Sequence, residues 1–159
     1  MKARLDQTDW KILNELQRDG AITNVELARR VGISAPPCLR RVRALEEAGI
    51  IQGYRALLDE KSLGFDLTAF VLVGLASQAE ADLLAFEERI RGWSIVRECH
   101  LASGEVDFIL KCVAPDLRAF QAFVIEDLTK APNVESVRTS LTLRRVKDEA
   151  LVPIGDKGP

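Results

Sequence analysis

The chain has 159 residues and a mass of 17.6 kDa, enough for one medium domain or two small ones. Apolar residues make up 47% and charged residues 29%, a composition that excludes a mainly disordered chain. No apolar run approaches the roughly 20 residues that span a bilayer, and the first ten residues lack the apolar stretch of a signal peptide. We therefore expect a cytoplasmic protein with no membrane partner. The formal net charge of −2 taken alone argues weakly against a nucleic-acid partner.

The charge is unevenly distributed along the chain. Residues 1–55 hold 10 Lys and Arg against 7 Asp and Glu, whereas residues 56–159 hold 12 against 17. Five arginines fall within 15 residues that contain no acid: Arg29, Arg30, Arg40, Arg41 and Arg43. Exposed charges act within a Debye length of about 10 Å, so this local excess matters more to a polyanion than the net charge does. The pattern indicates a basic N-terminal region and an acidic C-terminal region.

The three cysteines, Cys38, Cys99 and Cys112, are an odd and sparse set. Such a set is typical of reduced core thiols in a cytosolic protein and not of a disulfide framework.

Two helices are predicted at the start of the chain. The first begins after Asp6, a natural N-cap, and ends near Gly20, with an apolar stripe formed by Ile12, Leu13 and Leu16. The second begins with the capping box 23–26 and ends at Gly32.

A third helix follows after a connection of only two residues. Ser34 is its expected N-cap, and residues 36–37 place two prolines in the first turn, where a missing N–H costs little. Its predicted inner stripe is Leu39, Val42 and Leu45. Residues 50–55 then predict a short strand that starts a wing or a linker.

Two short helices joined by a tight glycine turn are typical of a helix-turn-helix, whose second helix enters the major groove. The residues expected to reach base edges are Ser34, Ala35, Pro37, Cys38 and Arg41. Those expected to hold phosphates are Arg29, Arg30, Arg40 and Arg43. The alternative is a helical hairpin whose arginines only solvate a surface.

The C-terminal region alternates strand and helix patterns. Residues 67–75 are apolar at nearly every position, as in a strand buried on both faces. A capping box at 77–80 predicts a helix that runs to Gly92, and strands are expected at about 94–102 and 105–113.

A second helix and a last strand complete this pattern. Asp116 is expected to cap a helix that stops before Pro132. The last strand alternates clearly, with four residues expected on one face: Val137, Thr139, Leu141 and Leu143.

The predicted order is βαββαβ, the ferredoxin-like unit, in which both helices pack on one face of a four-stranded sheet. The fold class is therefore α+β. A first strand with apolar residues on both sides needs a cover for the other face, and in a short chain a second copy is the expected cover. We predict an obligate homodimer formed by this domain.

The turn at 102–107 has two interpretations. It is either a plain hairpin with a glycine at positive φ, or a loop for a small ligand. In the second case free N–H groups would bind a carboxylate and Asp107 an ammonium group.

Other chemistry is not expected. The single histidine, His100, lies next to Cys99, and neighbours in a strand point to opposite faces, which argues against a metal site and against a Cys/His nucleophile pair. No glycine-rich phosphate loop precedes a helix. We therefore expect a protein that is not an enzyme and has no metal and no cofactor.

At the level of the whole chain, the residues resemble the leucine-responsive/asparagine-responsive (Lrp/AsnC) transcriptional regulators. In the N-terminal region the resemblance rests on residues 5–6, 12–13, 25–28, 32–34, 41–42, 45–46, 49–51 and 53–54. In the C-terminal region it rests on residues 98–101, the Ser103-Gly104-x-x-Asp107 pattern and Pro115-Asp116.

The resemblance implies a winged helix-turn-helix at 1–55, a linker at 56–64, and an amino-acid-metabolism regulatory (ACT-like) domain at 65–146. The tail 147–159 has no packing pattern and is expected to be mobile. The family binds promoter DNA as dimers that assemble to tetramers or octamers, with amino acids as effectors. The effector residues that the resemblance implies are Leu101, Ser103, Gly104, Glu105, Val106, Asp107, Thr139 and Ser140. The alternative function is an effector-sensing oligomer whose N-terminal region binds a protein partner instead of DNA.

Overall fold

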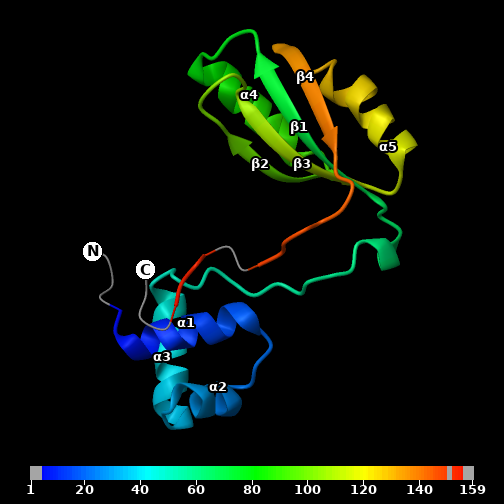
Figure 1. Ribbon diagram of the computed structural model, residues 1–159. Helices are drawn as coiled ribbons and strands as arrows, with labels where there is room; N and C mark the ends of the chain where they lie inside the picture. Colours follow the sequence, from blue (N-terminus) through cyan, green and yellow to red (C-terminus); the bar gives the residue numbers. More distant parts are fainter. Residues whose placement is uncertain (1–4, 150–151, 156–159) are drawn as a thin grey trace. The chain divides into compact units, whose positions relative to one another are not determined.

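The computed structural model describes residues 5–149 and 152–155. The chain forms two compact units (Figure 1). The first, here called the head, comprises Met1–Leu57 together with Lys147–Pro159, and the second, the body, comprises Leu58–Val146. The C-terminal segment therefore belongs to the unit that holds the N-terminal helices.

The head contains three helices, α1 (Gln7–Arg18), α2 (Asn24–Val31) and α3 (Ala35–Glu47). Asp6 caps α1, because its carboxylate accepts from the N–H of Asp9 at 2.9 Å while the Asp9 carboxylate accepts from the N–H of Asp6 at 3.0 Å. The three helices share one core: Ile12, Leu13, Leu27, Ala28, Val31, Cys38 and Leu45. The three predicted helices are confirmed.

The connection between α2 and α3 is as tight as the sequence predicts. Gly32 ends α2 with φ of 80°, a left-handed conformation that an L-residue rarely adopts. Thr23 caps the start of α2 by accepting from the N–H of Glu26 at 3.3 Å. Ser34 begins α3 without a side-chain cap bond, which leaves its hydroxyl exposed to solvent.

The predicted inner stripe of α3 is wrong by one residue. Cys38, Val42 and Leu45 face the core, whereas Leu39 is 39% exposed. Residues 38, 42 and 45 are separated by four and three positions, and residues 39, 42 and 45 by three and three, so periodicity alone could not separate the two stripes. Val42 and Leu45 face the core as predicted, and Cys38 takes the place of Leu39.

The predicted strand at 50–55 is also wrong. Within the described residues this segment has no regular secondary structure. Ile51 packs against the head core, and the Tyr54 hydroxyl donates to the Glu46 carboxylate at 3.0 Å. The N–H groups of Ile50 and Ile51 also donate to the carbonyl of Leu45, at 3.0 and 3.2 Å, so the segment is held to the end of α3 without a strand ladder.

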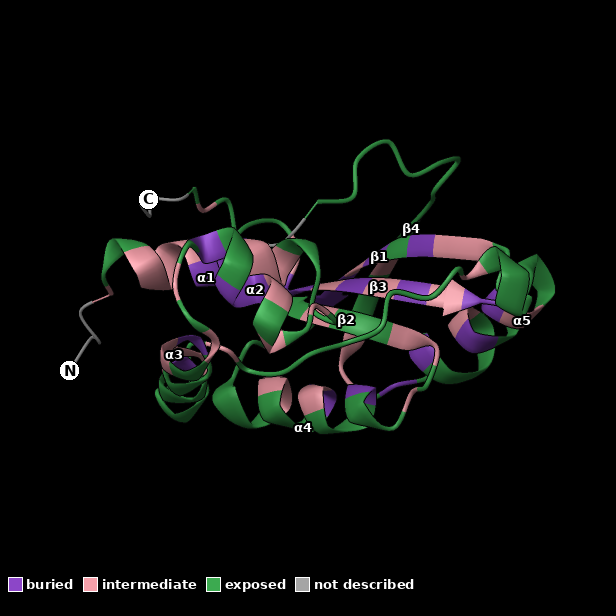
Figure 2. Cartoon of the chain, turned by 90° about the horizontal axis from the view of Figure 1, so that it is seen from below, coloured by how far each residue is buried: buried purple, intermediate pink, exposed green. Residues whose placement is uncertain are grey.

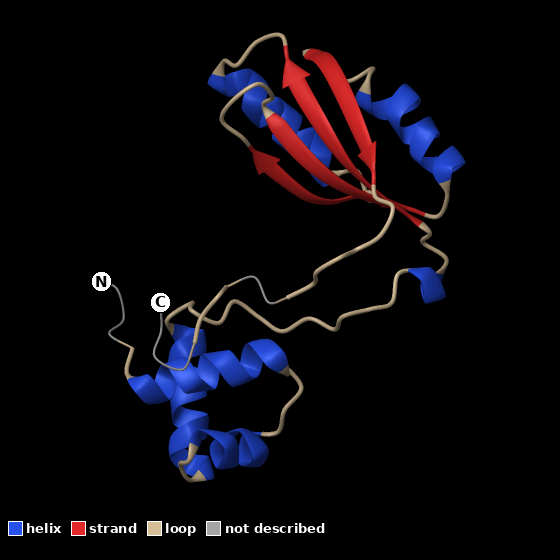
Figure 3. Ribbon diagram, viewed as in Figure 1, coloured by secondary structure: helices blue, strands red, loops and turns tan. Residues whose placement is uncertain are grey.

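The body contains a four-stranded antiparallel sheet with two helical segments (Figure 3). Its strands are β1 (Leu67–Leu75), β2 (Val96–Leu101), β3 (Phe108–Ala114) and β4 (Val134–Leu141), in the order β2-β3-β1-β4. Helix α4 (Glu80–Arg91) joins β1 to β2, and α5 (Leu117–Ala122), continued by the π-helical turn Phe123–Leu128, joins β3 to β4. A short 3₁₀ helix at Lys61–Leu63 precedes β1. The predicted βαββαβ ferredoxin-like order is confirmed.

Several boundaries differ from the prediction, and β2 spans Val96–Leu101 where about 94–102 was expected. Helix α4 begins at Glu80 with Ala79 as its N-cap, because the Ser77 hydroxyl donates to the Asp82 carboxylate at 2.6 Å instead of capping. Strand β3 begins at Phe108, since residues 105–107 belong to the turn. Strand β4 spans Val134–Leu141, so Leu143 lies beyond it and is fully exposed.

The body core lies between the sheet and its helices. Buried residues alternate along β3 and along most of β1, and they form one cluster with buried residues of α4 and α5. Figure 2 marks the buried residues of these strands in purple. Trp93 closes this core, with its ring 5.2 Å from that of Phe123 and 6.0 Å from that of Phe86.

The opposite face of the sheet is not covered by the described part of the body. Phe70, in the central strand β1, is 42% exposed, while its neighbours Ala69 and Val71 are fully buried. Phe70 pairs with Lys111 of β3 and Ser140 of β4, so these residues share its face. The strand is therefore apolar on both sides but buried on only one.

Candidate DNA-binding and effector sites

The outward face of α3 carries a group of exposed side chains at its start and middle. These residues are Ser34, Pro36, Leu39, Arg40 and Arg43. Among the described residues, Arg40 and Arg43 take part in no ion pair, so both guanidinium groups face solvent with their charge uncompensated by a contact. Pro36 and Leu39 were not among the predicted site residues, because Leu39 was assigned to the inner stripe and Pro36 only to the first turn of the helix.

Three residues that were expected to reach bases, Cys38, Ala35 and Pro37, are buried or half-buried. Cys38 is fully buried in the head core, and this burial raises the pKa of its thiol. Its side chain points away from the outward face and does not fit a base contact. Ala35 and Pro37 are half-buried at the start of the helix.

Arg41 connects α3 to the start of α1. Its Nη1 donates to Asp6 Oδ2 at 2.7 Å and to Asp9 Oδ1 at 2.8 Å. The bond from the Asp9 N–H is the main cause that lowers the pKa of Asp6, and Arg41 adds to it. Arg41 therefore occupies the position of a brace between two helices, and the expectation that it reaches a base does not fit this geometry.

Arg29 and Arg30, at the end of α2, are exposed but paired. Glu26 accepts from Arg29 Nη2 at 2.6 Å and from Arg30 Nε at 2.9 Å. Arg30 also donates to Glu15 of α1 at 3.1 Å. The hydrogen bonds from Arg29 and Arg30 lower the pKa of Glu26 to about 2. These two arginines are less available to an anion than Arg40 and Arg43.

In the body, the turn 102–107 has a defined shape. Gly104 adopts φ of 134°, and the N–H of Ala102 donates to the carbonyl of Asp107 at 2.8 Å. The backbone N–H groups of Ser103, Gly104 and Glu105 donate to no acceptor among the described residues. These three donors are exposed and available to a ligand carboxylate.

Asp107 does not fit the predicted role of binding an ammonium group. Its side chain is buried, and its Oδ2 accepts from the N–H of Leu75 at 2.6 Å. Its own N–H donates to the carbonyl of Val73 at 2.9 Å. Asp107 thus anchors the turn to the end of β1, where the partner is 32 residues away in the chain.

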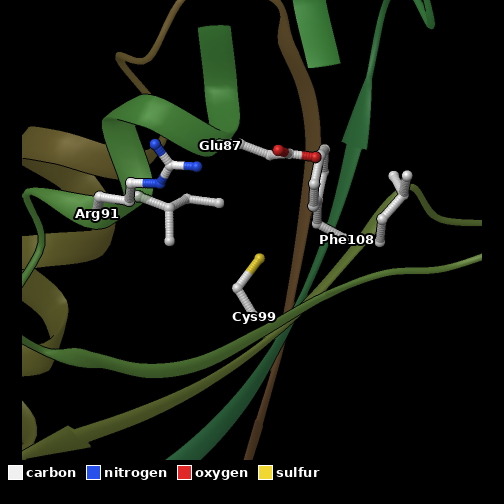
Figure 4. A pocket seen from close by; sticks show the side chains of 6 residues that line it. Glu87, Arg91, Cys99 and Phe108 are labelled. Atoms are coloured by element: carbon white, nitrogen blue, oxygen red, sulfur yellow. The ribbon is translucent and has the colours of Figure 1, made fainter. Parts of the chain in front are cut away.

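Leu101 lines a cavity of about 330 Å³ between β2 and α4. Figure 4 shows Glu87 and Arg91 extending from α4, with Cys99 pointing toward that helix from its strand. Ile90 and Phe108 complete the apolar part of the wall. Burial, with a further contribution from the Glu87 charge, raises the pKa of Cys99 to about 11, so its thiol stays protonated.

The expected effector residues of β4 are separated from this cavity within one chain. Strands β2 and β4 are the two edges of the sheet, and three strand spacings put them about 14 Å apart. Thr139 pairs with Val71, whose side chain faces the helices, whereas Ser140 pairs with Phe70 on the opposite face. The described chain alone therefore does not bring Leu101, Thr139 and Ser140 together.

The described residues contain neither a metal-binding cluster nor a membrane-spanning helix. No group of three or more His, Cys, Asp or Glu side chains is placed to hold a metal ion there. No helix in the same part of the chain is long and apolar enough to cross a membrane.

Two family models match the chain in these two regions. The model for a winged helix-turn-helix DNA-binding domain matches residues 5–52, and the model for the Lrp/AsnC ligand binding domain matches residues 68–152. The chain belongs to the Lrp/AsnC family. It is a transcriptional regulator with a DNA-binding head and a ligand-binding body.

Relatives of this Lrp/AsnC regulator cover nearly its whole length. A leucine-responsive regulatory protein of Rhizobium meliloti (strain 1021) is 61% identical over 97% of this chain and 99% of its own. The leucine-responsive regulatory protein of Escherichia coli (strain K12) is 44% identical over 90% of this chain and 87% of its own.

Solved structures agree with the fold of this regulator. A transcriptional regulator from Neisseria meningitidis, solved as a complex with L-methionine, has a TM-score of 0.90 at 39% identity, over 94% of this chain and 97% of its own. An AsnC family regulator from Agrobacterium tumefaciens has a TM-score of 0.87 at 34% identity, over 94% of this chain and 97% of its own.

Replacement of Arg41 by alanine is expected to destabilise the head. The variant loses a partly exposed, two-partner ion pair, so the free energy of unfolding should fall by about 1 kcal/mol. The ratio of specific to random DNA affinity should stay unchanged. Thermal unfolding and binding to both DNAs measure these quantities, with Arg40→Ala as the matched control that should spare stability. Loss of specificity at unchanged stability would contradict the assignment of Arg41 as a brace.

The head is expected to lose stability in acid through Asp6. The pKa of Asp6 is lowered in the folded state, so its contribution is complete above the unfolded-state pKa and is lost as the pH falls through the folded-state value. Stability followed by urea unfolding between pH 6 and pH 2 should therefore decline below about pH 4. Asp6→Asn keeps a capping side chain but removes the charge, so its decline in that range should be shallower. An identical acid profile for both proteins would rule out Asp6 as a cause.

Proposed function

We propose that this regulator binds promoter DNA sequence-specifically through α3, acts as an oligomer, and changes its DNA affinity when an amino-acid effector binds the body. The observation that carries the DNA part is the outward face of α3. This face presents Arg40 and Arg43 without ion-pair partners among the described residues, on a helix held by the tight turn at Gly32. Such a helix fits the major groove, which is about 12 Å wide.

The residues divide into two roles in this proposal. Ser34, Pro36 and Leu39 lie on the exposed part of α3 nearest its start, where a recognition helix reaches base edges. Arg40 and Arg43 bind phosphates or guanine, with Ala35 and Pro37 shaping the contact at the helix start. Arg29 and Arg30 are secondary phosphate contacts, because each must first leave Glu26.

The oligomer follows from the uncovered face of the sheet. Phe70 and its half-buried neighbour Leu72 lie on the face opposite the helices, next to Ile109 of β3. A second copy of the same face would remove this apolar surface from water and form a homodimer with two heads. Dimers that assemble to tetramers or octamers would bind linked half-sites more tightly than one head does.

The effector site is proposed at the turn 102–107, completed by a second chain. The free N–H groups of Ser103, Gly104 and Glu105 would bind the effector carboxylate, as oriented backbone N–H groups do for anions. Leu101 would contact the apolar part of the effector, while Thr139 and Ser140 would come from another copy, since one chain keeps them about 14 Å from β2. The L-methionine bound to the Neisseria meningitidis regulator supports an amino acid as the effector.

The proposed activity needs no catalysis and no cofactor. A regulator of this kind works in the cytoplasm, where its DNA is. The second candidate function is a head that binds a protein partner instead of DNA. The two candidates differ in whether promoter DNA binds with an affinity that falls with salt concentration.

The salt dependence of promoter binding tests the DNA-binding function. Each phosphate contact contributes about 0.9 to the slope of log affinity against log salt. The Arg40→Ala, Arg43→Ala double variant should therefore bind promoter DNA at least 10-fold more weakly and with a shallower slope, as measured by fluorescence anisotropy at 50 and 200 mM salt. Arg91→Ala, an exposed arginine of the body, is the control and should behave as the parent protein. No affinity for promoter DNA at either salt concentration would favour the protein-partner alternative.

Thermal unfolding in the presence of single amino acids tests the effector site. A ligand that binds only the folded body raises its melting temperature, by an amount that grows with ligand concentration. Gly104→Ala should abolish this rise, because alanine cannot adopt φ of 134° without strain and the loop must change its conformation. The added methyl group itself meets nothing within 4 Å, so the effect is on the backbone and not on packing. Gly92→Ala, a glycine with ordinary φ at the end of α4, should keep it. A rise that survives Gly104→Ala would place the ligand elsewhere.

A further inference from the structure

The C-terminal segment contacts α1 of the head, although the sequence there shows no packing pattern. We infer that α1 carries a docking surface for the chain's own residues 152–155, and that this segment acts as a strap that stabilises the head. Gln17, Val152 and Ile154 carry this inference.

Gln17 binds the strap through its backbone. Its Nε2 donates to the carbonyl of Val152 at 3.1 Å, and its Oε1 accepts from the N–H of the same residue at 3.3 Å. The primary amide has a donor and an acceptor side by side, so it pairs with a peptide unit as a neighbouring strand would. This contact joins residues that are 135 positions apart in the chain.

Ile154 supplies the apolar part of the contact. Its side chain is half-buried and packs against the head core, to which Leu5, Trp10 and Ile51 also contribute at the edge. The N–H of Ile154 donates to the carbonyl of Val152 at 2.8 Å, which folds the segment into a tight turn around Pro153. Proline restricts φ before docking, so the turn loses less conformational entropy when it binds.

The strap gives the head a second covalent connection to the body. The chain enters the body after residue 57, ahead of β1, and returns to the head unit at residue 147, after β4. The segments before and after the body therefore both belong to the head unit. The strap also occupies part of the head surface in a domain whose predicted wing strand at 50–55 does not form.

A double-mutant cycle in the full chain tests the strap. The variants are Gln17→Met, which removes both hydrogen bonds at nearly equal helix propensity, Ile154→Asp, which puts a charge where the apolar contact is, and the double variant. All are made with Trp93→Phe, so that Trp10 is the single tryptophan and its fluorescence reports on the head alone. Ile154→Asp should lower the midpoint of head unfolding by about 5 °C. Gln17→Met should lower it in the parent but not in the Ile154→Asp background.

Amide exchange gives a second, direct measurement. The N–H of Val152 should exchange faster in Gln17→Met than in the parent, because its acceptor is gone. Gln121→Met, an exposed glutamine on α5, is the matched control for both measurements and should change neither. Additive shifts in the cycle, or Val152 exchange that is the same in Gln17→Met and the parent, would overturn the strap.

Discussion

The body depends on one constraint, which is that its central strand β1 needs a cover on both faces. β1 is hydrogen-bonded to β3 on one side and to β4 on the other, so it lies in the interior of the sheet. Its alternate side chains therefore point either toward the helices or away from them. The helices bury Ala69, Val71 and Val73 completely, but Phe70 on the other face keeps 42% of its surface exposed. The single chain thus buries one face of the strand, and the proposed homodimer would bury the other.

The same strand also fixes the proposed effector loop. The N–H of Leu75 and the carbonyl of Val73, at the end of β1, hold the side chain and the backbone of Asp107. Because Asp107 is anchored in this way, the exposed N–H groups of Ser103 to Glu105 keep a defined direction. A ligand at this loop would contact residues held by the end of β1, and a second copy would pack on the open face of the same strand. Strand β1 would therefore couple effector binding to assembly.

Local patterns in the sequence predicted the elements well and the contacts between them poorly. β1 was predicted with the bounds it has, since a long apolar run is a strong signal, and the caps at Asp6, Thr23 and Asp116 form as expected. The turn around Gly104 was predicted from its position between two strands, and the family resemblance added the expected effector role. Arg41 and Asp107 took other roles than predicted, because their partners are 35 and 32 residues away along the chain. A sequence pattern has no access to such pairs, and the same holds for the contact between Gln17 and Val152.

The pairing of Glu26 with Arg29 and Arg30 changes what these basic residues mean for DNA. Glu26 is an anion that already occupies the two guanidinium groups, in the geometry that a phosphate would use. A phosphate that binds here must displace a carboxylate, so the net gain is the difference between two anions and not the full attraction of two free charges. In the proposed DNA complex, such an exchange would make the end of α2 a weaker contact than the outward face of α3. In that complex, Glu26 would therefore compete with the phosphate for Arg29 and Arg30, and the two guanidinium groups would bind DNA less strongly than unpaired ones.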